Sequence, residues 1–376
     1  MDVAFVSNVV YPFVTGGAQK RIHEIGRRLA DEGHDVTVYG RHFWDGPTVI
    51  EYEGMTLRAV SPERDLYTDD RRSITEAIEF AADLLVPLRR HIDTHDLVVT
   101  SVFPYFPVLT AKASTLLEGT PLVTTWHEVW GSYWEGYLGR LAPFGKAVER
   151  ATAKVPQKPV AVSGVTADRL ARIGPSRDRI TVVPNGISTE QVEAIPPAAD
   201  GFNVLFAGRH IADKNVDVLL RAFDRVAPDH DVTLGIVGEG PETDRLRRLV
   251  RRLEHTERIT FLGSLDEYED VLAHMHAADV FGSASTREGF GIAVLEAMAA
   301  DCTVVAADHP ESAASEVVGD AGFLPAPTVD AFADALDRAL CGESPSADPV
   351  ATAREYDWDN VVDQIERVYR DTLDGT

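Results

Sequence analysis

Cysteine, lysine and long apolar runs are scarce in this chain of 376 residues. The two cysteines, Cys302 and Cys341, show no metal-binding spacing and require no disulfide. No stretch approaches about 18 consecutive apolar residues, so we expect no membrane-spanning helix. The first residues lack the basic and apolar segments of a signal peptide. We therefore expect a cytoplasmic protein, with at most a contact at the inner face of a membrane.

Positive charge is also in short supply, because the formal net charge is −24 and only six of the 36 basic residues are lysine. This balance excludes a general nucleic-acid binder, which needs a basic surface. It is typical of a salt-rich cytoplasm, where screening weakens self-repulsion, although simple compositional bias is the alternative. Residues 1–184 carry a net charge of −2 and residues 185–376 carry −22. The first half is thus the one we expect to approach an anionic surface.

Short apolar runs alternate with helical patterns in both halves of the chain, which predicts an α/β protein with two Rossmann-like, doubly wound parallel sheets. The expected strands of the first half are Val3–Ser7, Val36–Tyr39, Leu97–Ser101, Leu122–Trp126, Val160–Ser163 and Thr181–Val183. Those of the second half are Asn203–Ala207, Thr233–Val237, Ile259–Leu262, Val280–Gly282 and Thr303–Ala306. The turn pattern Pro184-Asn185-Gly186 places the boundary between the domains. We expect domains over residues 1–184 and 185–355, and a final helix within 356–376.

The strongest chemical pattern pairs two carboxylates eight positions apart, Glu288 in a loop and Glu296 on the helix that follows. Gly289 and Gly291 flank Phe290, so the backbone from there to Ile292 can approach a ligand closely. The start of the helix offers free N–H groups and a positive dipole end, which suits phosphate. The carboxylates can accept hydrogen bonds from sugar and ribose hydroxyls. Two solvated glutamates beside a glycine-rich turn are the alternative.

A pair of cations, Arg209 and Lys214, follows the strand that ends at Ala207. Ligands bind at such strand ends in open α/β sheets. Two fixed cations can offset the negative charge that develops on a leaving diphosphate, so that no metal is required. An ordinary pair of surface cations is the alternative, which the excess of acidic residues in this half disfavours.

Three further loops carry weaker patterns. Gly16 and Gly17 precede a helix and can cradle phosphate or an anionic acceptor, although they do not form the G-x-G-x-x-G pattern of dehydrogenases. His127 ends a predicted strand, where it can hydrogen-bond a sugar hydroxyl or transfer a proton, with a structural histidine as the alternative. Glu239, in Gly238-Glu239-Gly240-Pro241, leaves a strand and starts a helix that can meet a diphosphate or base.

The segment 126–158 combines aromatic and basic side chains. Trp130, Tyr133, Trp134 and Tyr137 can stack on an acceptor sugar or lie among lipid headgroups, with core packing as the alternative. Lys146, Arg150, Lys154 and Lys158 are spaced four apart and form a basic stripe, although Pro156 is expected to shorten the helix. This stretch predicts a peripheral contact with an anionic membrane or a lipid phosphate, and an ordinary exposed helix is the alternative.

Taken together, these residues resemble the retaining glycosyltransferases of family 4, which have the two-domain GT-B fold. The resemblance covers nearly the whole chain and includes Pro184-Asn185-Gly186-Ile187, Phe261-Leu262-Gly263 and Tyr356-Asp357-Trp358. It implies an N-terminal acceptor domain, a C-terminal nucleotide-sugar domain, and a last helix that returns to the N-terminal domain. The two domains would face a cleft between them.

By this resemblance, Arg209 and Lys214 bind the diphosphate of a UDP- or GDP-linked sugar, and Glu296 binds the ribose. Glu288 and the backbone of Phe290–Ile292 hold the sugar and phosphates, and His127 contacts the sugar near the reaction centre. The acceptor is expected to be a glycan or a lipid-linked saccharide. No cofactor and no metal are expected, because the D-x-D pairs at Asp229/Asp231 and Asp357/Asp359 lie in a turn and at a helix start.

The chain departs from the family pattern after Ala300. Asp301 and Thr303 stand where the family usually has Gly and Pro, and His309-Pro310-Glu311-Ser312 replaces a common Gly-Gly pair near the donor sugar. Two other functions remain open at this point: a nucleotide-sugar epimerase or hydrolase of the same architecture, and a non-catalytic module that only binds the nucleotide sugar.

Overall fold

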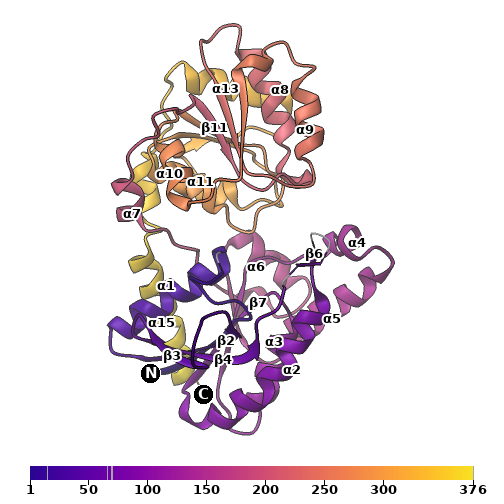
Figure 1. Ribbon diagram of the computed structural model, residues 1–376, viewed down its shortest axis with the longest axis vertical. Coiled ribbons are helices and arrows are strands. Elements are labelled where there is room, and N and C mark those ends of the chain that lie inside the picture. Colours follow the sequence, from indigo (N-terminus) through magenta and orange to yellow (C-terminus); the bar gives the residue numbers. More distant parts are fainter. Residues whose placement is uncertain (15, 66, 69–70, 376) are drawn as a thin grey trace. The chain divides into compact units, whose positions relative to one another are not determined.

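The computed structural model of the protein describes residues 1–14, 16–65, 67–68 and 71–375. The chain forms two compact units, Met1–Asn185 together with Trp358–Thr376, and Gly186–Asp357. The first is called unit 1 and the second unit 2. The predicted boundaries lie within two residues of these limits. The last helix belongs to unit 1 although the whole of unit 2 precedes it in the sequence (Figure 1).

Unit 1 is built on an eight-stranded sheet with the strand order β10-β9-β8-β7-β1-β2-β4-β3. Its strands are β1 (Asp2–Val6), β2 (Asp35–His42), β3 (Val49–Tyr52), β4 (Met55–Pro62), β7 (Leu97–Val102), β8 (Leu122–Trp126), β9 (Lys158–Ala161) and β10 (Thr181–Val182). A separate ribbon joins β5 (Tyr67–Thr68) to β6 (Arg71–Arg72). All neighbours in the large sheet are parallel except β3 and β4.

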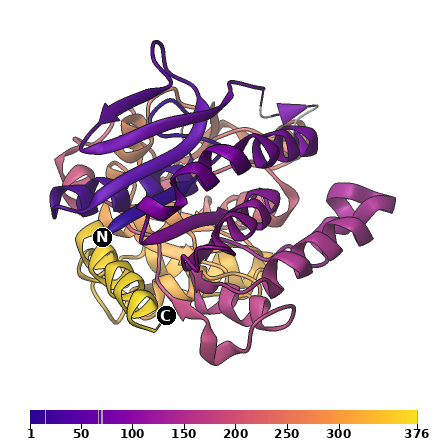
Figure 2. The same ribbon diagram turned by 90° about the horizontal axis from the view of Figure 1, so that it is seen from below.

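Helices cover both faces of this sheet (Figure 2). They are α1 (Gly17–Asp31), α2 (Ile74–His91), α3 (Phe106–Thr115), α4 (Tyr133–Leu138), α5 (Ala142–Lys154), α6 (Gly164–Ala171) and α15 (Trp358–Asp374). Alternation along β1 divides the core, because Val3 and Phe5 pack towards α1 and α15, whereas Ala4 and Val6 pack towards α2 and α3. The strand is therefore apolar throughout, as a sheet buried on both faces requires.

Unit 2 repeats the design with a six-stranded parallel sheet in the order β13-β12-β11-β14-β15-β16. Its strands are β11 (Val204–Ala207), β12 (Leu234–Val237), β13 (Ile259–Gly263), β14 (Val280–Ser283), β15 (Thr303–Ala306) and β16 (Gly322–Phe323). Its helices are α7 (Thr189–Ala194), α8 (Val216–Val226), α9 (Thr243–Val250), α10 (Tyr268–His276), α11 (Ile292–Ala299), α12 (Ala314–Val318), α13 (Val329–Leu340) and α14 (Pro349–Arg354).

Three features differ from the sequence prediction. The hairpin β3–β4 was not expected, and its antiparallel pairing makes the sheet of unit 1 mixed rather than fully parallel. Glu53 and Gly54 both have positive φ in its turn, a conformation that suits a two-residue hairpin. The two-residue strand β16 is too short to produce a sequence pattern. The apolar pattern predicts a helix over Phe290–Ala300, whereas α11 begins at Ile292, because Gly291 has a φ of 102° and cannot belong to the helix.

Candidate functional site

In unit 2 the strand order reverses between β11 and β14, which pair in parallel at the centre of the sheet. Loops that leave the carboxyl ends of two such strands diverge to opposite sides, and open α/β sheets bind their ligands in the resulting crevice. The loop after β11 carries Arg209 and Lys214, and the loop after β14 carries Glu288. The topology thus brings the predicted cations and the first predicted carboxylate to one edge of the sheet.

Lys214 and Glu288 form an ion pair across this edge, with the Nζ of Lys214 donating to Oε1 of Glu288. The two side chains are 21% and 16% exposed, so both are partly removed from solvent. Of the six lysines of the chain, Lys214 alone lies between residues 186 and 357. This ammonium group thus lies at the point where the strand order reverses, which is where open α/β sheets bind their ligands.

The two loops are also joined by Asn215, which directly follows Lys214. Its amide nitrogen donates to the carbonyl of Ala284 at 3.3 Å and to Oγ1 of Thr286 at 3.0 Å. The amide of Thr286 in turn donates to the carbonyl of Asp213 at 2.9 Å. Asn215 has a φ of 44°, a left-handed conformation that asparagine tolerates better than most residues. These bonds fix the backbone on both sides of the ion pair.

Arg209 directly follows Gly208 at the end of β11, and its side chain is exposed. Within the described part of the chain it forms no ion pair, which leaves its guanidinium available to a ligand. The backbone beside it is held against the next loop, because the amide of Gly208 donates to Val237 and that of His210 donates to Glu239. A guanidinium on a fixed backbone suits bidentate contact with phosphate.

Helix α11 begins after the loop that carries Glu288, so its first N–H groups face the same edge of the sheet. Gly291 provides the left-handed turn before the helix, and a side chain at this position would be strained. Phe290 is 5% exposed and packs against Tyr356 with ring centroids 5.8 Å apart, so it is an anchor for the turn rather than a ligand contact. Of the predicted segment Gly289–Ile292, the backbone N–H groups are therefore the part that can contact a phosphate.

Glu296, the second predicted carboxylate, lies on α11 and is 7% exposed. The hydroxyl of Tyr268, at the start of α10, donates to Oε1 of Glu296 at 2.5 Å. Glu296 is therefore not the solvated surface glutamate that was the alternative, because its carboxylate is buried and one oxygen is held by a tyrosine. Tyr268 was missed by the sequence analysis, because a tyrosine at a helix start carries no distinctive pattern.

The loop Gly238-Glu239-Gly240-Pro241 lies against the loop that carries Arg209. A Cβ on Gly238 would come within 2.2 Å of the carbonyl oxygen of Gly208, and one on Gly240 within 2.4 Å of that of His210. Both contacts are with backbone, so glycine is required for this close approach. A cavity of about 360 Å³ opens beside the loop and is lined by Glu239, Gly240, Pro241, Thr243, Asp244 and Arg247.

In unit 1 the strand order reverses between β1 and β7, and the remaining predicted residues follow strands near that point. Gly16 and Gly17 stand at the start of α1, as predicted, with Gly17 as its first residue. A narrow pocket at the ends of β1 and β7 is lined by Ser7, Asn8, Gln19, Ser101 and Pro104, among others. Unit 1 therefore has a small pocket at the corresponding ends of its strands.

His127 immediately follows β8 and its Nε2 lies 3.3 Å from Oγ of Ser101. Burial, with a smaller contribution from the charge of Arg21, lowers the pKa of His127 to about 3. The imidazole is consequently neutral at pH 7, where it can donate or accept a hydrogen bond but has no proton to release as an acid. This favours a sugar contact over the proton-transfer role that the sequence also allowed.

Arg21, which the sequence analysis did not single out, is 1% exposed on α1. It donates to the carbonyls of Val183 and Pro184 and to Oδ1 of Asn185 at 3.1 Å, so it holds the last residues of unit 1 before the chain enters unit 2. Burial lowers its pKa to about 10, which leaves it charged at neutral pH. Its position one turn before the apolar Ile25 was the available indication that it is buried.

The aromatic residues of segment 126–158 pack mainly against one another. Trp134 is 6% exposed and lies 4.7 Å from Trp130, measured between ring centroids, and a Cβ on Gly145 would meet its indole at 2.4 Å. The core-packing alternative therefore holds for Trp134. Trp130 lies before α4 and Tyr133 begins it, and both side chains are partly exposed.

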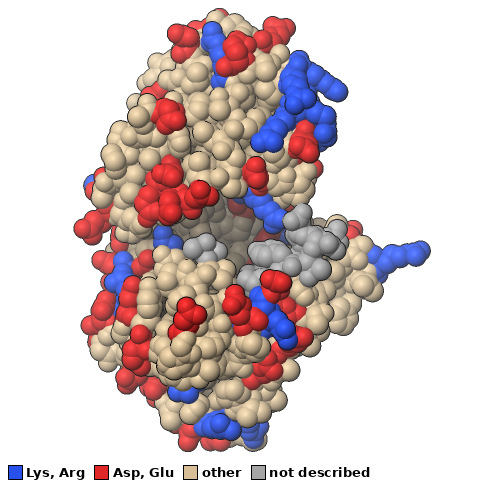
Figure 3. Space-filling model, in the orientation of Figure 1, with Lys and Arg blue, Asp and Glu red and all other residues tan. Residues whose placement is uncertain are grey.

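The basic stripe is shorter than predicted. Helix α5 ends at Lys154, and Lys158 belongs to β9, so Lys158 is not on the helix. Lys146 pairs with Glu135 at 2.7 Å, whereas Arg150 and Lys154 are exposed. Leu141 and Phe144 on the same α4–α5 hairpin are 67% and 55% exposed. The hairpin projects from unit 1 (Figure 2), and Lys or Arg atoms lie at its outer end (Figure 3).

No helix in the described residues is both long and apolar enough to cross a bilayer. The predicted site residues fall into two groups by unit: Gly16, Gly17, His127 and the hairpin in unit 1, and the cations, carboxylates and glycine-rich loops in unit 2. In unit 2, Lys214 and Glu288 are in contact, and Arg209 and the glycine-rich loops follow the carboxyl ends of strands in the same sheet.

Comparison with known proteins agrees with this arrangement. Residues 15–191 match the model of Glycosyltransferase Family 4, and residues 188–356 match that of Glycosyl transferases group 1. A phosphatidyl-myo-inositol mannosyltransferase of Mycolicibacterium smegmatis is 31% identical over 379 residues, covering 96% of this chain and 92% of the relative. A glycogen synthase of Mycobacterium tuberculosis is 27% identical over 391 residues, covering 98% and 94%.

The fold agrees as well. The crystal structure of Anabaena Alr3699/HepE in complex with UDP and glucose superposes with a TM-score of 0.72 at 19% identity, covering 99% of this chain and 100% of that one. The match extends over both units, so it reports on the architecture of the whole chain. The two Rossmann-like sheets, the last helix within unit 1 and the family matches over residues 15–191 and 188–356 lead to one conclusion: this chain is a glycosyltransferase of family 4 with the GT-B fold.

Proposed function

We propose that the protein transfers a hexose from a UDP- or GDP-linked sugar to a glycan or lipid-linked acceptor, with retention of anomeric configuration and without a metal. One observation carries the donor assignment: Lys214 and Glu288 meet between the ends of β11 and β14, beside the start of α11. The UDP complex of the Anabaena protein, which shares the fold, supports a nucleoside diphosphate as the donor's leaving group.

The chemistry follows from the charge that develops as the glycosidic bond breaks. The leaving nucleoside diphosphate gains negative charge, and an exposed guanidinium at Arg209, the ammonium of Lys214 and the N–H groups of α11 offer fixed positive potential. Three such groups replace the divalent cation that other transferases use. Lys214 is held by Glu288, so in this proposal its position is set before the donor binds.

Retention requires that the acceptor approach the same face of the sugar that the diphosphate leaves. In this proposal the acceptor hydroxyl gives its proton to the departing phosphate oxygen, and no covalent enzyme intermediate forms. Glu288 supports this because its carboxylate is engaged with Lys214 instead of standing alone as a nucleophile. The neutral imidazole of His127 would hydrogen-bond the donor sugar from unit 1.

For the acceptor, the exposed side of the α4–α5 hairpin supports a contact with an anionic membrane surface. Leu141 and Phe144 present apolar area to solvent, and Arg140, Arg150 and Lys154 are exposed on the same hairpin. This combination is typical of interfacial helices and contrasts with the acidic composition of the whole chain. One relative is named for a phosphatidylinositol acceptor, in agreement with a lipid-linked substrate.

A transfer assay distinguishes this function from the alternatives. The protein is incubated with a panel of UDP- and GDP-sugars, with and without glycan and lipid-linked acceptors, in the presence of EDTA, and the product anomer is read by NMR. The proposal expects acceptor-dependent release of nucleoside diphosphate and a product with the donor's configuration. Release without an acceptor would indicate a hydrolase, a new sugar epimer would indicate an epimerase, and binding without turnover would indicate a binding module.

A further inference from the structure

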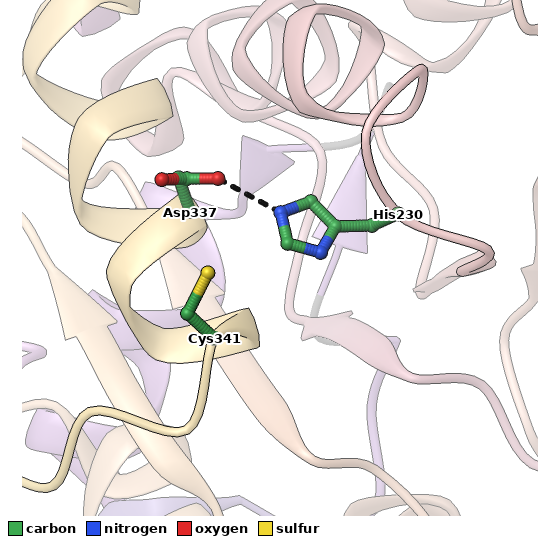
Figure 4. Close-up of side chains that lie close together, drawn as sticks. All are labelled: His230, Asp337 and Cys341. Atoms are coloured by element: carbon green, nitrogen blue, oxygen red, sulfur yellow. Dashed lines mark hydrogen bonds and ion pairs between the residues drawn. The ribbon is translucent and has the colours of Figure 1, made fainter.

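A second cluster of chemically active side chains lies in unit 2, away from the donor site. His230, Asp337 and Cys341 place one ligand atom each within 4.8 Å of the others, and Nε2 of His230 lies 2.8 Å from Oδ1 of Asp337 (Figure 4). The thiol of Cys341 faces the same space from the end of α13. Neither the transfer chemistry nor the packing of the core uses these groups.

The fold holds the three residues close together. Asp337 and Cys341 are four positions apart at the end of α13, so their side chains share one side of the helix. His230 lies in the segment that joins α8 to β12, and Arg258 fixes that segment by donating to the carbonyls of Ala227 at 2.9 Å and His230 at 2.6 Å. His230 is 15% exposed, whereas Asp337 is 51% exposed and can adjust to a ligand.

The ligand types select a class of cation. An imidazole nitrogen, a thiolate and a carboxylate together suit Zn²⁺, which takes mixed N, S and O ligands in a tetrahedron. Calcium and magnesium prefer sets made of oxygen atoms, which this cluster does not provide. Asp229 and Asp231 flank His230, and unit 2 carries 32 acidic against 13 basic residues, so the surroundings attract a cation.

We propose that His230, Asp337 and Cys341 form a zinc site, with water as the fourth ligand. Binding replaces the His230–Asp337 hydrogen bond with two metal bonds and releases the thiol proton of Cys341 to solvent. The ion joins the end of α13 to the segment before β12, and so fastens together two parts of unit 2 that are about 100 residues apart in the sequence.

The site is structural and has no part in sugar transfer, because it lies at the other ends of the strands from the donor site. His230 precedes β12, at the amino ends of the strands, whereas Arg209, Lys214 and Glu288 follow the carboxyl ends. The D-x-D pair at Asp229/Asp231 was set aside as a metal motif, and neither carboxylate belongs to the cluster. The residue between them does.

Cobalt is the probe of choice, because a thiolate bound to Co²⁺ gives a near-ultraviolet charge-transfer band that carboxylate and imidazole ligands do not. The full chain is stripped of metal with a chelator, kept reduced and titrated with Co²⁺, and Zn²⁺ is then added in competition. We expect one Co²⁺ per chain with the thiolate band, displacement by Zn²⁺, and a higher thermal unfolding midpoint with zinc.

Cys341→Ser and His230→Gln should each weaken zinc binding at least about tenfold and abolish the zinc-dependent rise of the midpoint. Both residues lie at the surface, and circular dichroism checks the fold. His255→Gln is the matched control, because Nδ1 of His255 lies 3.2 Å from Oδ1 of Asp224 in the same unit with no thiol nearby. Transfer activity should be the same in all three variants.

A second group that meets the same distance criterion, Glu32, His34 and Glu366, contains no cysteine, so cobalt bound there lacks the thiolate band. The proposal is overturned if cobalt binds without that band, if Cys341→Ser binds zinc as tightly as the unmodified chain, or if zinc fails to bind at micromolar concentration. A failure of the transfer assay leaves this test unaffected, because it measures metal binding and unfolding alone.

Discussion

Both units contain a sheet in which the strand order reverses, but the two units differ in the number of charged residues they carry. The parallel part of each sheet reverses its strand order, between β1 and β7 in unit 1 and between β11 and β14 in unit 2. Unit 1 carries a net charge of −5 and five of the six lysines, whereas unit 2 carries −19 and one. The lysine that unit 2 retains lies at the reversal point, paired with Glu288. In an acidic protein, the sites of the remaining cations are thus informative about anionic ligands.

The comparison is tested most severely at Lys214. Lys214→Ala should lower kcat by more than about 100-fold, because one preorganised group at a site of developing charge contributes about 3 kcal/mol. The thermal unfolding midpoint should change little, since the ion pair is partly exposed. Lys214→Arg is the control, and it should recover part of the activity because it restores the charge without the geometry. A turnover close to that of the unmodified enzyme would remove the diphosphate assignment.

The corresponding test in unit 1 concerns the hairpin. Changing Arg150 and Lys154 together to Gln should weaken binding to vesicles with anionic lipid by about 2 kcal/mol, at about 1 kcal/mol for each cation near the surface. Cosedimentation at low salt measures this. The matched control replaces Leu116 and Leu117 with Ser, because this pair is 64% and 70% exposed elsewhere in unit 1. Equal binding by the cation variant and the control would show that the hairpin is not a membrane contact.

Substitution of Asn215 should lower both stability and activity, because its side chain joins the two loops. Asn215→Gly keeps the left-handed backbone but removes two hydrogen bonds, with an expected loss of about 1–2 kcal/mol in the free energy of unfolding. Asn215→Ala should lose about 1 kcal/mol more, since a Cβ is disfavoured at positive φ. Denaturant unfolding and kcat are measured together. If both variants kept full activity despite the loss of stability, the loops would not position the donor.

Glu296 should affect donor affinity more than turnover. Glu296→Gln preserves the shape of the side chain and removes the charge that the ribose would meet. A hydrogen bond to a charged group contributes about 1.5 kcal/mol, so KM for the donor should rise about tenfold. Steady-state kinetics at varied donor concentration separate KM from kcat. Tyr268→Phe is the milder companion, because it removes one hydrogen bond to Glu296. An unchanged KM in both would argue against a ribose contact.

The sequence predicted the α/β class, the two domains and their boundaries within two residues, because apolar runs of strand length between amphipathic helices leave few alternatives. It also predicted that Lys214 and Glu288 lie at strand ends. It did not predict that their side chains pair, because that depends on the strand order, which places β11 beside β14 although the paired residues are 76 positions apart in the sequence. The roles of Asn215 and Tyr268 depend on the same tertiary placement.

Errors arose where a local pattern admits two environments. The aromatic spacing around Trp134 fits both a ligand platform and a core, and the close approach of Gly145 decides for the core. The hairpin β3–β4 was missed because its turn, Glu53-Gly54, is less distinctive than Asn-Gly or Asp-Gly. Cys341 shows no metal-binding spacing in sequence, since its proposed partner His230 lies more than 100 positions away.

A crystal structure of the protein with a UDP- or GDP-sugar tests directly where the donor diphosphate binds. We expect the diphosphate between Arg209, Lys214 and the first turn of α11, with the ribose hydroxyls on Glu296. A diphosphate bound away from the ends of β11 and β14, with Lys214 still paired only to Glu288, would contradict it.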